Sequence, residues 1–189
     1  MRTHGRLGKG ISNARLVRVS KLMSLVLRHK PEQFDVLLDP EGYVSIDDLV
    51  RALRGPIPDA SIDDVRHVVE TIEPDKARFS ISGTDIKANY GHSLSMRIAH
   101  QQVVPPEILL HGTSEDAVSG IRRHGIHPMR RQYVHLTTNL DLATRVGNRH
   151  GKTRVLEVNA LRAAESGVAF YRANASFWLA DLVPPEFVR

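Results

Sequence analysis

The chain contains no cysteine, so a disulfide bond, a thiolate nucleophile and a cysteine-based zinc site are all excluded. It also lacks any apolar run close to the roughly 20 residues that a membrane-spanning helix needs. The first twenty residues are basic, but they lack the apolar stretch of a secretory signal. Together these absences predict a cytoplasmic protein with no membrane association.

Aromatic residues are scarce at 5%, whereas charged residues make up 25% and hydrophobic residues 41% of the 189 positions. This composition is typical of a folded globular protein and excludes fibrous and fully disordered classes. The formal net charge of +5 favours a polyanionic partner such as nucleic acid only slightly over general surface solubility. The length allows one large domain or two small ones.

Three common catalytic signatures are missing as well. The chain has no Walker-type glycine-rich loop, no Gly-x-Gly-x-x-Gly motif and no His-Glu-x-x-His motif. Clustered acidic and histidine ligands are not evident either, so no metal ion is expected. What the chain offers instead is clusters of arginine, histidine and lysine, which stabilise phosphate charge by hydrogen bonds rather than through a metal.

The first hundred residues carry the signals of three helices and a hairpin. Apolar residues recur at helical spacing from Leu16 to Leu27, and Pro31 ends that helix. Ser45 and Ser61 each stand three residues before an aspartate, in the form of a capping box, and begin two further helices. The expected strands are 43–44, 79–81 and 86–89.

This order of elements predicts a winged helix for residues 1–100, a domain that commonly holds nucleic acid, although a fold alone proves no function. Prolines near residues 101–107 indicate a boundary. Residues 101–189 then alternate strands with short helices, so the whole chain is predicted to be α+β. The expected strands are 108–110, 134–137, 154–158, 168–171 and 177–182, and the expected helices are 115–124 and 141–146.

Four clusters are candidates for chemistry, and each has a plain structural alternative. Arg28-His29-Lys30 either grips phosphate or complements the dipole of the helix that it ends, and composition alone favours the second. The segment 87–93 suits a sugar-phosphate backbone or an ordinary polar hairpin. The segment 111–113 is either a ligand-binding strand end or a simple turn into a helix. The segment 129–138 places two arginines before a strand histidine, which is either a site or a satisfied histidine beside solvated arginines.

Taken together and in this order, these clusters closely resemble the tRNA 2′-phosphotransferase family, from about Val19 to Val188. The motifs are Ser-Lys-Leu-Met-Ser-Leu-Val-Leu-Arg-His at 20–29, Asn-Tyr-Gly-His-Ser at 89–93, His-Gly-Thr at 111–113, Met-x-Arg-x-x-Val-His-Leu at 129–136, Val-Gly-x-Arg-His-Gly at 146–151, Trp178-Leu179 and Val183-Pro184-Pro185. The resemblance implies an N-terminal winged-helix lobe (1–100) that holds RNA. It also implies a C-terminal lobe (101–189) like the NAD-binding fold of ADP-ribosyltransferases.

The resemblance implies an enzyme that removes an internal RNA 2′-phosphate with NAD as co-substrate and without a metal. The 2′-phosphate attacks the NAD ribose, nicotinamide leaves, and the ribose 2″-hydroxyl then attacks the phosphate. The products are RNA with a free 2′-hydroxyl, ADP-ribose 1″,2″-cyclic phosphate and nicotinamide. The implied partner is an RNA with a 2′-phosphate of the tRNA splice-junction type, and no obligate protein partner is expected.

The resemblance also assigns site residues. The family handles phosphate with an Arg-His-Arg-Arg tetrad, and Arg28, His29 and Arg131 match its first, second and last members. The third position is Lys87, which keeps the charge but loses the bidentate fork of arginine. The implied RNA-binding residues are Lys87, Asn89, His92 and Ser93, and the implied cofactor-binding residues are His111, Gly112, Thr113, His135, Leu136, Thr137, Arg149 and Gly151.

Two other functions stay open. An ADP-ribosyltransferase that leaves ADP-ribose on a nucleic acid or a protein would share the His-x-Thr motif, but protein modification needs no phosphate grip. A non-catalytic RNA-binding winged-helix protein would explain the charge and the first lobe, but it would leave the motifs of the second lobe without a use.

Overall fold

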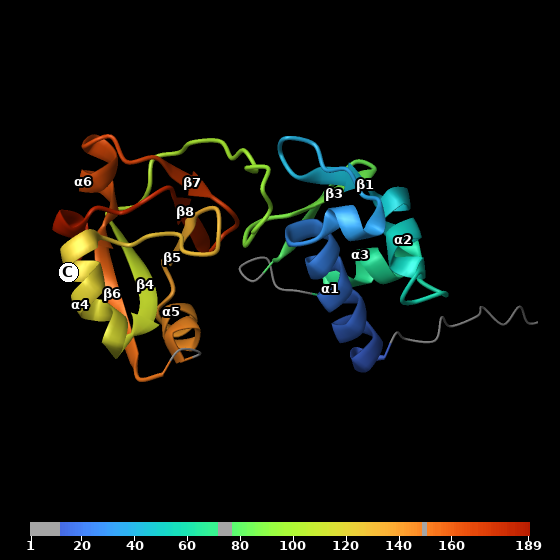
Figure 1. Cartoon of the computed structure of the whole chain (residues 1–189), viewed down its shortest axis with the longest axis horizontal. Helices are drawn as coiled ribbons and strands as arrows, with labels where there is room; N and C mark the ends of the chain where they lie inside the picture. The colour runs from blue at the N-terminus through green and yellow to red at the C-terminus, as the bar shows by residue number, and fades with distance from the viewer. Residues whose placement is uncertain (1–11, 72–76, 149–150) are drawn as a thin grey trace, which may run out of the picture.

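The structure of the protein is a computed structural model that describes residues 12–71, 77–148 and 151–189. Its helices and antiparallel sheets confirm the predicted α+β class. The elements surround two hydrophobic cores, one in the N-terminal half and one in the C-terminal half (Figure 1). In chain order they are α1 (Asn13–Arg28), η1 (Pro31–Phe34), β1 (Tyr43–Ser45), α2 (Ile46–Arg54), α3 (Ile62–Glu70), β2 (Phe79–Ser82), β3 (Asp85–Ala88), β4 (Ile108–Ser114), α4 (Glu115–His124), β5 (Val134–Thr137), α5 (Leu140–Gly147), β6 (Thr153–Asn159), α6 (Ala160–Glu165), β7 (Phe170–Arg172), β8 (Phe177–Ala180) and η4 (Pro185–Phe187).

In the N-terminal half, α1, α2 and α3 share one core with a three-stranded sheet of order β1-β3-β2. Strands β2 and β3 form the expected hairpin, whose turn holds Gly83 at a φ of 60°, a conformation that glycine adopts without steric cost. Ile86 and Ala88 of β3 are buried in the core. Lys87 between them therefore points to the opposite face of the sheet, as strand alternation requires.

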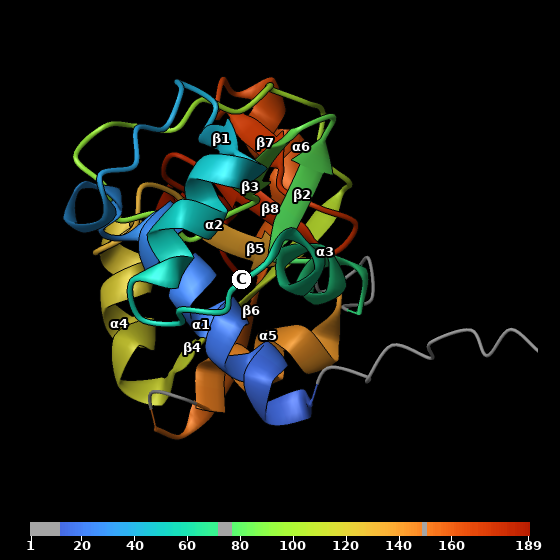
Figure 2. The same cartoon turned by 90° about the vertical axis from the view of Figure 1, so that its right-hand side faces the viewer.

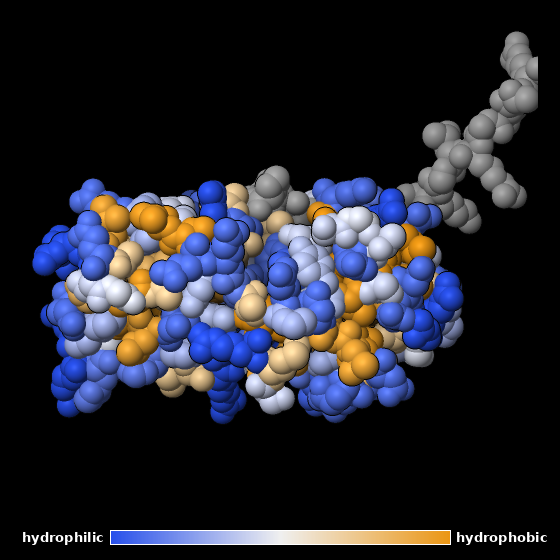
Figure 3. Space-filling view, turned by 90° about the horizontal axis from the view of Figure 1, so that it is seen from above, coloured by the Kyte–Doolittle hydropathy of each residue, from blue (hydrophilic) through white to orange (hydrophobic). Residues whose placement is uncertain are grey.

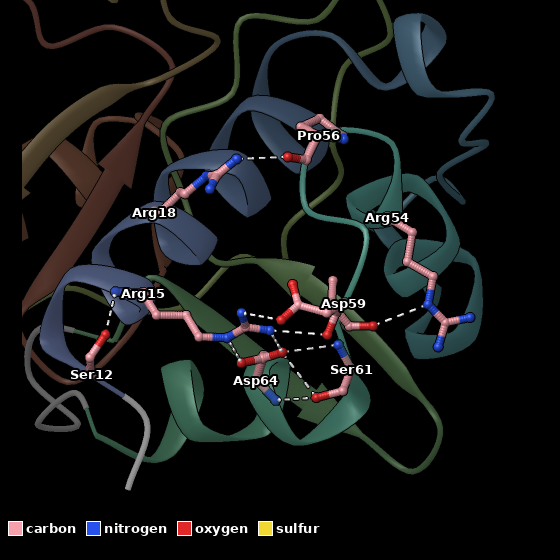
Figure 4. Close-up of polar contacts among 9 residues, drawn as sticks. Ser12, Arg15, Arg18, Arg54, Pro56, Asp59, Ser61 and Asp64 are labelled. Carbon is pink, nitrogen blue, oxygen red and sulfur yellow. Dashed lines mark hydrogen bonds and ion pairs between the residues drawn. The ribbon is translucent and has the colours of Figure 1, made fainter. Parts of the chain in front are cut away.

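A network of charged groups ties the first helix to the third (Figure 4). Arg15 of α1 donates from Nε to Oδ1 of Asp64 at 2.7 Å and from Nη2 to Oδ2 at 2.8 Å. Its Nη1 also donates to the exposed carboxylate of Asp59 at 2.8 Å. Asp64 and Ser61 complete the capping box predicted for α3, since each side chain accepts from the N–H group of the other. These hydrogen bonds, the one from Arg15 above all, lower the pKa of Asp64 to about 2.

We expect Asp64→Asn to lower the free energy of unfolding by roughly 2–3 kcal/mol near neutral pH, because a buried carboxylate loses charge-assisted hydrogen bonds. The pKa of Asp64 is lower in the folded protein than in the unfolded chain. Its stabilisation is therefore present above about pH 4 and is lost as the pH falls toward the folded pKa. Urea unfolding at a series of pH values measures this, and the curves of the two proteins should converge in acid.

The matched control is Asp59→Asn, which removes the exposed partner of the same arginine. Its effect should be clearly smaller, because water screens an exposed pair. Equal losses from the two variants, or a difference that does not shrink in acid, would contradict this role of Asp64.

In the C-terminal half, a five-stranded antiparallel sheet of order β6-β4-β5-β8-β7 packs with α4, α5 and α6. Two expectations were wrong here. The strand expected to end at Leu110 continues to Ser114, because this whole stretch pairs with β6. Segment 160–165, for which no element was predicted, forms α6, and Asn159 caps it by accepting from the Arg162 N–H group.

Helix α5 lies directly against β4, and two glycines allow this contact. A methyl group at Gly112 would lie 1.8 Å from the carbonyl oxygen of Ala143, and one at Gly147 would lie 2.9 Å from the carbonyl oxygen of Thr113. Both distances are shorter than non-bonded atoms can approach. Gly112 is therefore needed for the packing of α5 on the sheet.

The segment that joins the two cores is fixed to the C-terminal half. Oε1 of Gln132 accepts from the Ile98 N–H group at 3.0 Å, and its Nε2 donates to the Leu94 carbonyl at 3.0 Å. The Tyr133 hydroxyl donates to the Ile98 carbonyl at 2.7 Å, and the ring of His100 meets the ring of Tyr133 edge-on at 5.2 Å. These contacts hold the connecting segment against the C-terminal half.

Helices α1 and α5 come from different halves but lie on the same side of the molecule (Figures 1 and 2). Seen from above, apolar side chains form small patches among hydrophilic ones on both halves (Figure 3). None of the helices in the described part of the chain has the length and apolarity needed to cross a bilayer.

Candidate functional site

Two arginines from different halves meet at one loop residue. Arg28 is the last residue of α1, and Arg131 lies just before β5. A methyl group at Gly91 would lie 3.6 Å from Nη1 of each guanidinium, and Nη1 of Arg131 donates to the Gly91 carbonyl. Gly91 has a φ of 88°, so glycine is the residue that fits this turn without strain. The sequence separates the two arginines by about a hundred positions, and the fold brings them together.

Neither guanidinium forms an ion pair with a carboxylate of residues 12–71, 77–148 or 151–189. Burial lowers the pKa of Arg28 to about 10, and the charges of Arg78 and Arg131 add to this effect. Burial also lowers the pKa of Arg131. Arg28 is half-buried and Arg131 is exposed beside it. Two neighbouring cations with no carboxylate of the described residues between them repel each other, so the pair is suited to an anion that enters between them.

Aromatic rings hold Arg28 in place. Its guanidinium lies 5.0 Å from the ring centroid of Tyr90 and 5.4 Å from that of Phe79. Its Nη2 donates to the Arg78 carbonyl at 3.1 Å, whereas its buried Nε has no partner among the described residues. Arg28 lies in the last turn of α1, where its charge complements the helix dipole, but the carbonyl to which it donates belongs to another segment.

His29 is placed beside this pair. Its Nδ1 lies 2.8 Å from Oγ of Ser93, and the Ser93 N–H group donates to the Arg28 carbonyl at 2.9 Å. Burial lowers the pKa of His29, and the charges of Arg131 and Arg28 lower it further. The imidazole is therefore neutral at neutral pH, and its other nitrogen is left for a ligand.

Lys87 lies on the face of the N-terminal sheet opposite to the core, between the buried residues Ile86 and Ala88. Its Nζ sits 4.3 Å from the ring centroid of Tyr43, and its charge contributes to the lowered pKa of His100. None of its contacts joins it to Arg28 or Arg131.

Two of the residues expected to contact RNA are buried. His92 is 2% exposed, and burial followed by the charge of Arg28 lowers its pKa to about 3. Asn89 uses both ends of its amide inside the protein, accepting from Oγ of Ser80 at 2.6 Å and donating to the Ala77 carbonyl at 3.1 Å. The Asn89 side chain fixes the loop around Gly91, the buried Nε2 of His92 has no partner among the described residues, and Ser93 is exposed beside His29.

The expected cofactor residues lie on neighbouring strands. Nδ1 of His111 on β4 lies 3.1 Å from the His135 carbonyl on β5, and Thr113 follows on the same strand. The two strands pair only at Leu110 and Thr137, so they diverge beyond this point. Burial and the charge of Arg131 lower the pKa of His135 to about 4, which places this histidine near the arginine pair.

The remaining cofactor candidates differ in their surroundings. Leu136 is buried in the core behind His135, and Gly112 packs on α5. Thr137 is buried, and its hydroxyl accepts from the Asn139 N–H group at 3.1 Å. Gly151 is exposed at a φ of 112°. Arg149 lies outside the described residues.

Sequence reasoning missed the role of two aromatic residues. The rings of Tyr90 and Phe177, one from each half, lie 4.7 Å apart and are tilted by 32°. Tyr90 also meets His135 edge-on at 6.0 Å. An aromatic residue directly before Gly-His-Ser was the available signal, but nothing in the sequence pairs it with Phe177.

Comparisons with known proteins agree with one another. A family model described as RNA 2′-phosphotransferase, Tpt1/KptA family, matches residues 14–182. A probable RNA 2′-phosphotransferase of Bacillus thuringiensis subsp. konkukian is 42% identical over 173 residues, which are 90% of this chain and 92% of the relative. Proteins of the same description from Nostoc punctiforme and Pyrococcus horikoshii are 37% and 38% identical over 179 and 172 residues. These matches cover 95% and 90% of this chain and 99% and 96% of those relatives.

Proposed function

Because the chain belongs to the RNA 2′-phosphotransferase, Tpt1/KptA family, we propose that it transfers an internal RNA 2′-phosphate to the ADP-ribose part of NAD. The products are RNA with a 2′-hydroxyl, ADP-ribose 1″,2″-cyclic phosphate and nicotinamide. The observation that carries the proposal is the meeting of Arg28 and Arg131 at Gly91 without a carboxylate of the described residues to neutralise them. The proposed RNA carries the 2′-phosphate of a tRNA splice junction.

A phosphate dianion suits this pair better than other ligands. Each guanidinium presents several donors in a fixed plane, which match two oxygens of one phosphoryl group. Binding between the two cations restores the interactions that burial removed from them. Arg28 and Arg131 are therefore the proposed phosphate-binding catalytic residues, and they stabilise the charge that gathers on the phosphorus during transfer.

The proposed NAD residues fit a dinucleotide. With Nδ1 of His111 directed to the His135 carbonyl, its other nitrogen is left for a ribose hydroxyl. Thr113 adds a hydroxyl beside His111 on the same strand. Because β4 and β5 diverge after Leu110 and Thr137, the main-chain groups of Gly112 that face β5 are not paired with that strand. When bound, NAD supplies the ribose carbon that accepts the phosphate and the hydroxyl that then removes it from RNA. The loop that contains Arg149 and Gly151 is proposed for the pyrophosphate.

His29 and its neighbours have supporting roles in this proposal. The neutral imidazole of His29 donates a hydrogen bond from its ring N–H to the departing 2′-oxygen of the RNA, and only its protonated form would pass a proton to that oxygen. Ser93 orients the ring through Nδ1, while Asn89 and His92 hold the loop from inside.

We also propose a lobe assignment. The three helices and the hairpin of residues 1–100 support a winged-helix lobe that holds RNA. The five-stranded sheet of residues 101–189, with His111 and Thr113 where two strands diverge, supports an ADP-ribosyltransferase-like lobe.

The test is an oligoribonucleotide labelled at an internal 2′-phosphate, incubated with and without NAD. We expect the label to move to ADP-ribose cyclic phosphate only when NAD is present. Label retained on an RNA that has gained ADP-ribose would identify an ADP-ribosyltransferase instead. Binding of the RNA with no NAD-dependent change would identify an RNA-binding protein.

We expect Lys87→Arg to keep or raise the rate of phosphate transfer, because arginine restores the forked donor that the family has at this position. Lys87→Gln, which removes the charge, should lower the rate by about tenfold or more. Initial rates at saturating NAD measure both. A large loss of rate in Lys87→Arg would contradict the phosphate contact. It would mean that Lys87 matters through its contact with the Tyr43 ring, which a larger guanidinium disturbs.

A further inference from the structure

A cavity of about 550 Å³ opens between α1 of the N-terminal half and α5 of the C-terminal half. This volume lies in the range of small-molecule and nucleotide sites. Helix α1 contributes Asn13, Leu16, Val17, Ser20 and Lys21, and helix α5 contributes Leu142, Arg145 and Val146. The remaining wall consists of Val68, Thr71, Arg78, Tyr90 and Phe177. Figures 1 and 2 place the two helices on one side of the molecule. The lining residues come from both halves, so each half supplies part of the wall.

Among the described residues that line this cavity, the charged side chains are all basic. Lys21, Arg78 and Arg145 line it, and all three are exposed. No carboxylate belongs to its wall among the described residues. The cavity on the other side of His29, of about 700 Å³, instead contains Glu32 and Asp35. A polyanionic strand is therefore drawn to the cavity between the two helices rather than to the one beside His29.

The aromatic pair Tyr90 and Phe177 forms part of the wall. Because Tyr90 also packs against the Arg28 guanidinium at 5.0 Å, the cavity shares a residue with the arginine pair. A planar base that enters the cavity can stack on these aromatic residues, and Tyr90 links this position to the Arg28 guanidinium. Proteins that bind single strands without sequence preference combine aromatic platforms with cations in this way.

A buried serine gives a second indication of a ligand. Ser20 lines the cavity and is 9% exposed, yet its hydroxyl has no hydrogen-bond partner in the described part of the chain. Buried hydroxyl groups normally find a partner, so a bound molecule with a polar edge would complete this wall. The apolar side chains of Leu16, Val17 and Val68 beside it suit the face of a base.

From these features we propose that this cavity is a subsite for one nucleoside of the single-stranded RNA that carries the 2′-phosphate. The proposal rests on the proposed function, since the RNA is the substrate assigned there. It assigns stacking to Tyr90 and Phe177, and contact with the flanking phosphates to Lys21, Arg78 and Arg145. NAD is the less favoured occupant, because His111, Thr113 and His135 do not line the cavity.

The experiment measures binding rather than turnover. A fluorescent 2′-phosphorylated oligoribonucleotide is titrated with each protein by anisotropy at several salt concentrations, and NAD is titrated by calorimetry. The variants are Arg145→Glu, which reverses an exposed charge, and Phe177→Leu, which removes the aromatic face but keeps an apolar side chain. The matched control is Arg122→Glu on α4, which makes the same charge change at an exposed position outside the cavity.

We expect Arg145→Glu to raise the RNA Kd by about tenfold or more and to flatten its dependence on salt, because a phosphate contact is lost. Phe177→Leu should raise the RNA Kd by about fivefold or more without changing the salt dependence. The Kd for NAD should stay within about twofold in both variants, and Arg122→Glu should resemble the wild type.

Three results would overturn the proposal of a nucleoside subsite. The first is an unchanged RNA Kd in both variants, and the second is a raised Kd for NAD with unchanged RNA binding. The third is a rise of the RNA Kd in Arg122→Glu as large as that in Arg145→Glu. A wild type that binds the oligonucleotide but transfers no phosphate would refute the proposed function, and the binding data would still decide the subsite. An active wild type whose variants bind RNA normally would refute the subsite alone.

Discussion

Replacement of Arg131 by alanine should nearly stop release of the dephosphorylated RNA, while RNA that carries ADP-ribose builds up. In the proposed reaction the first transfer uses a nucleophile that is already an anion, so it depends mainly on placement. The second transfer concentrates negative charge on a phosphodiester, and Arg131 is one of the two cations that face it. Loss of one preorganised donor typically costs a factor of about 10²–10³ in kcat.

Gel analysis of a labelled 2′-phosphorylated oligonucleotide separates the starting RNA, the ADP-ribosylated RNA and the product. Arg130→Ala is the matched control, because Arg130 is the neighbouring arginine and is exposed. It should behave like the wild type. Normal turnover in Arg131→Ala, or an equal loss in Arg130→Ala, would contradict the role of Arg131.

Replacement of Arg28 by alanine should weaken both binding and transfer. Arg28 is held between Phe79 and Tyr90 and by the Arg78 carbonyl, so its remaining donors are oriented before the phosphate arrives. We expect kcat/KM for the RNA to fall by a factor of about 10²–10³ and the RNA Kd to rise, because the phosphate loses a charged partner in the ground state as well. Little intermediate should accumulate, in contrast to Arg131→Ala.

Steady-state rates and RNA titrations measure the effect of Arg28→Ala, and thermal unfolding checks that the variant is folded. Arg18→Ala is the control on the same helix, because Arg18 is exposed and donates to the Pro56 carbonyl away from the site (Figure 4). A variant of Arg28 that binds 2′-phosphorylated RNA as well as the wild type does would contradict the phosphate contact.

Local sequence signals predicted most of the secondary structure. Serine followed three residues later by aspartate marked the starts of α2 and α3, and alternating apolar residues marked the hairpin of β2 and β3. The full length of β4 was not predictable in this way, because His111, Gly112 and Thr113 are held in the strand by pairing with the distant β6. Tertiary pairing outweighed the local pattern, which looked like a turn.

The site was predicted only in part. Family resemblance selected Arg28 and Arg131, but no local pattern shows that they meet at Gly91. The sequence also could not distinguish side chains that are free to contact RNA from side chains whose hydrogen bonds lie inside the protein. Asn89 is polar and was expected to face RNA, yet its amide is used inside the protein, where it accepts from the Ser80 hydroxyl and donates to the Ala77 carbonyl.

One binding measurement tests most directly whether both halves hold the same phosphoryl group. The Kd values of two oligoribonucleotides that differ only in a 2′-phosphate or a 2′-hydroxyl are compared for the wild type, Arg28→Ala, Arg131→Ala and the double variant. We predict that each single variant lowers the preference for the phosphorylated RNA and that the loss in the double variant is smaller than the sum of the two single losses, because the two arginines act on one group. An undiminished preference in either single variant, or losses that simply add, would contradict the convergence of the two halves on one phosphate.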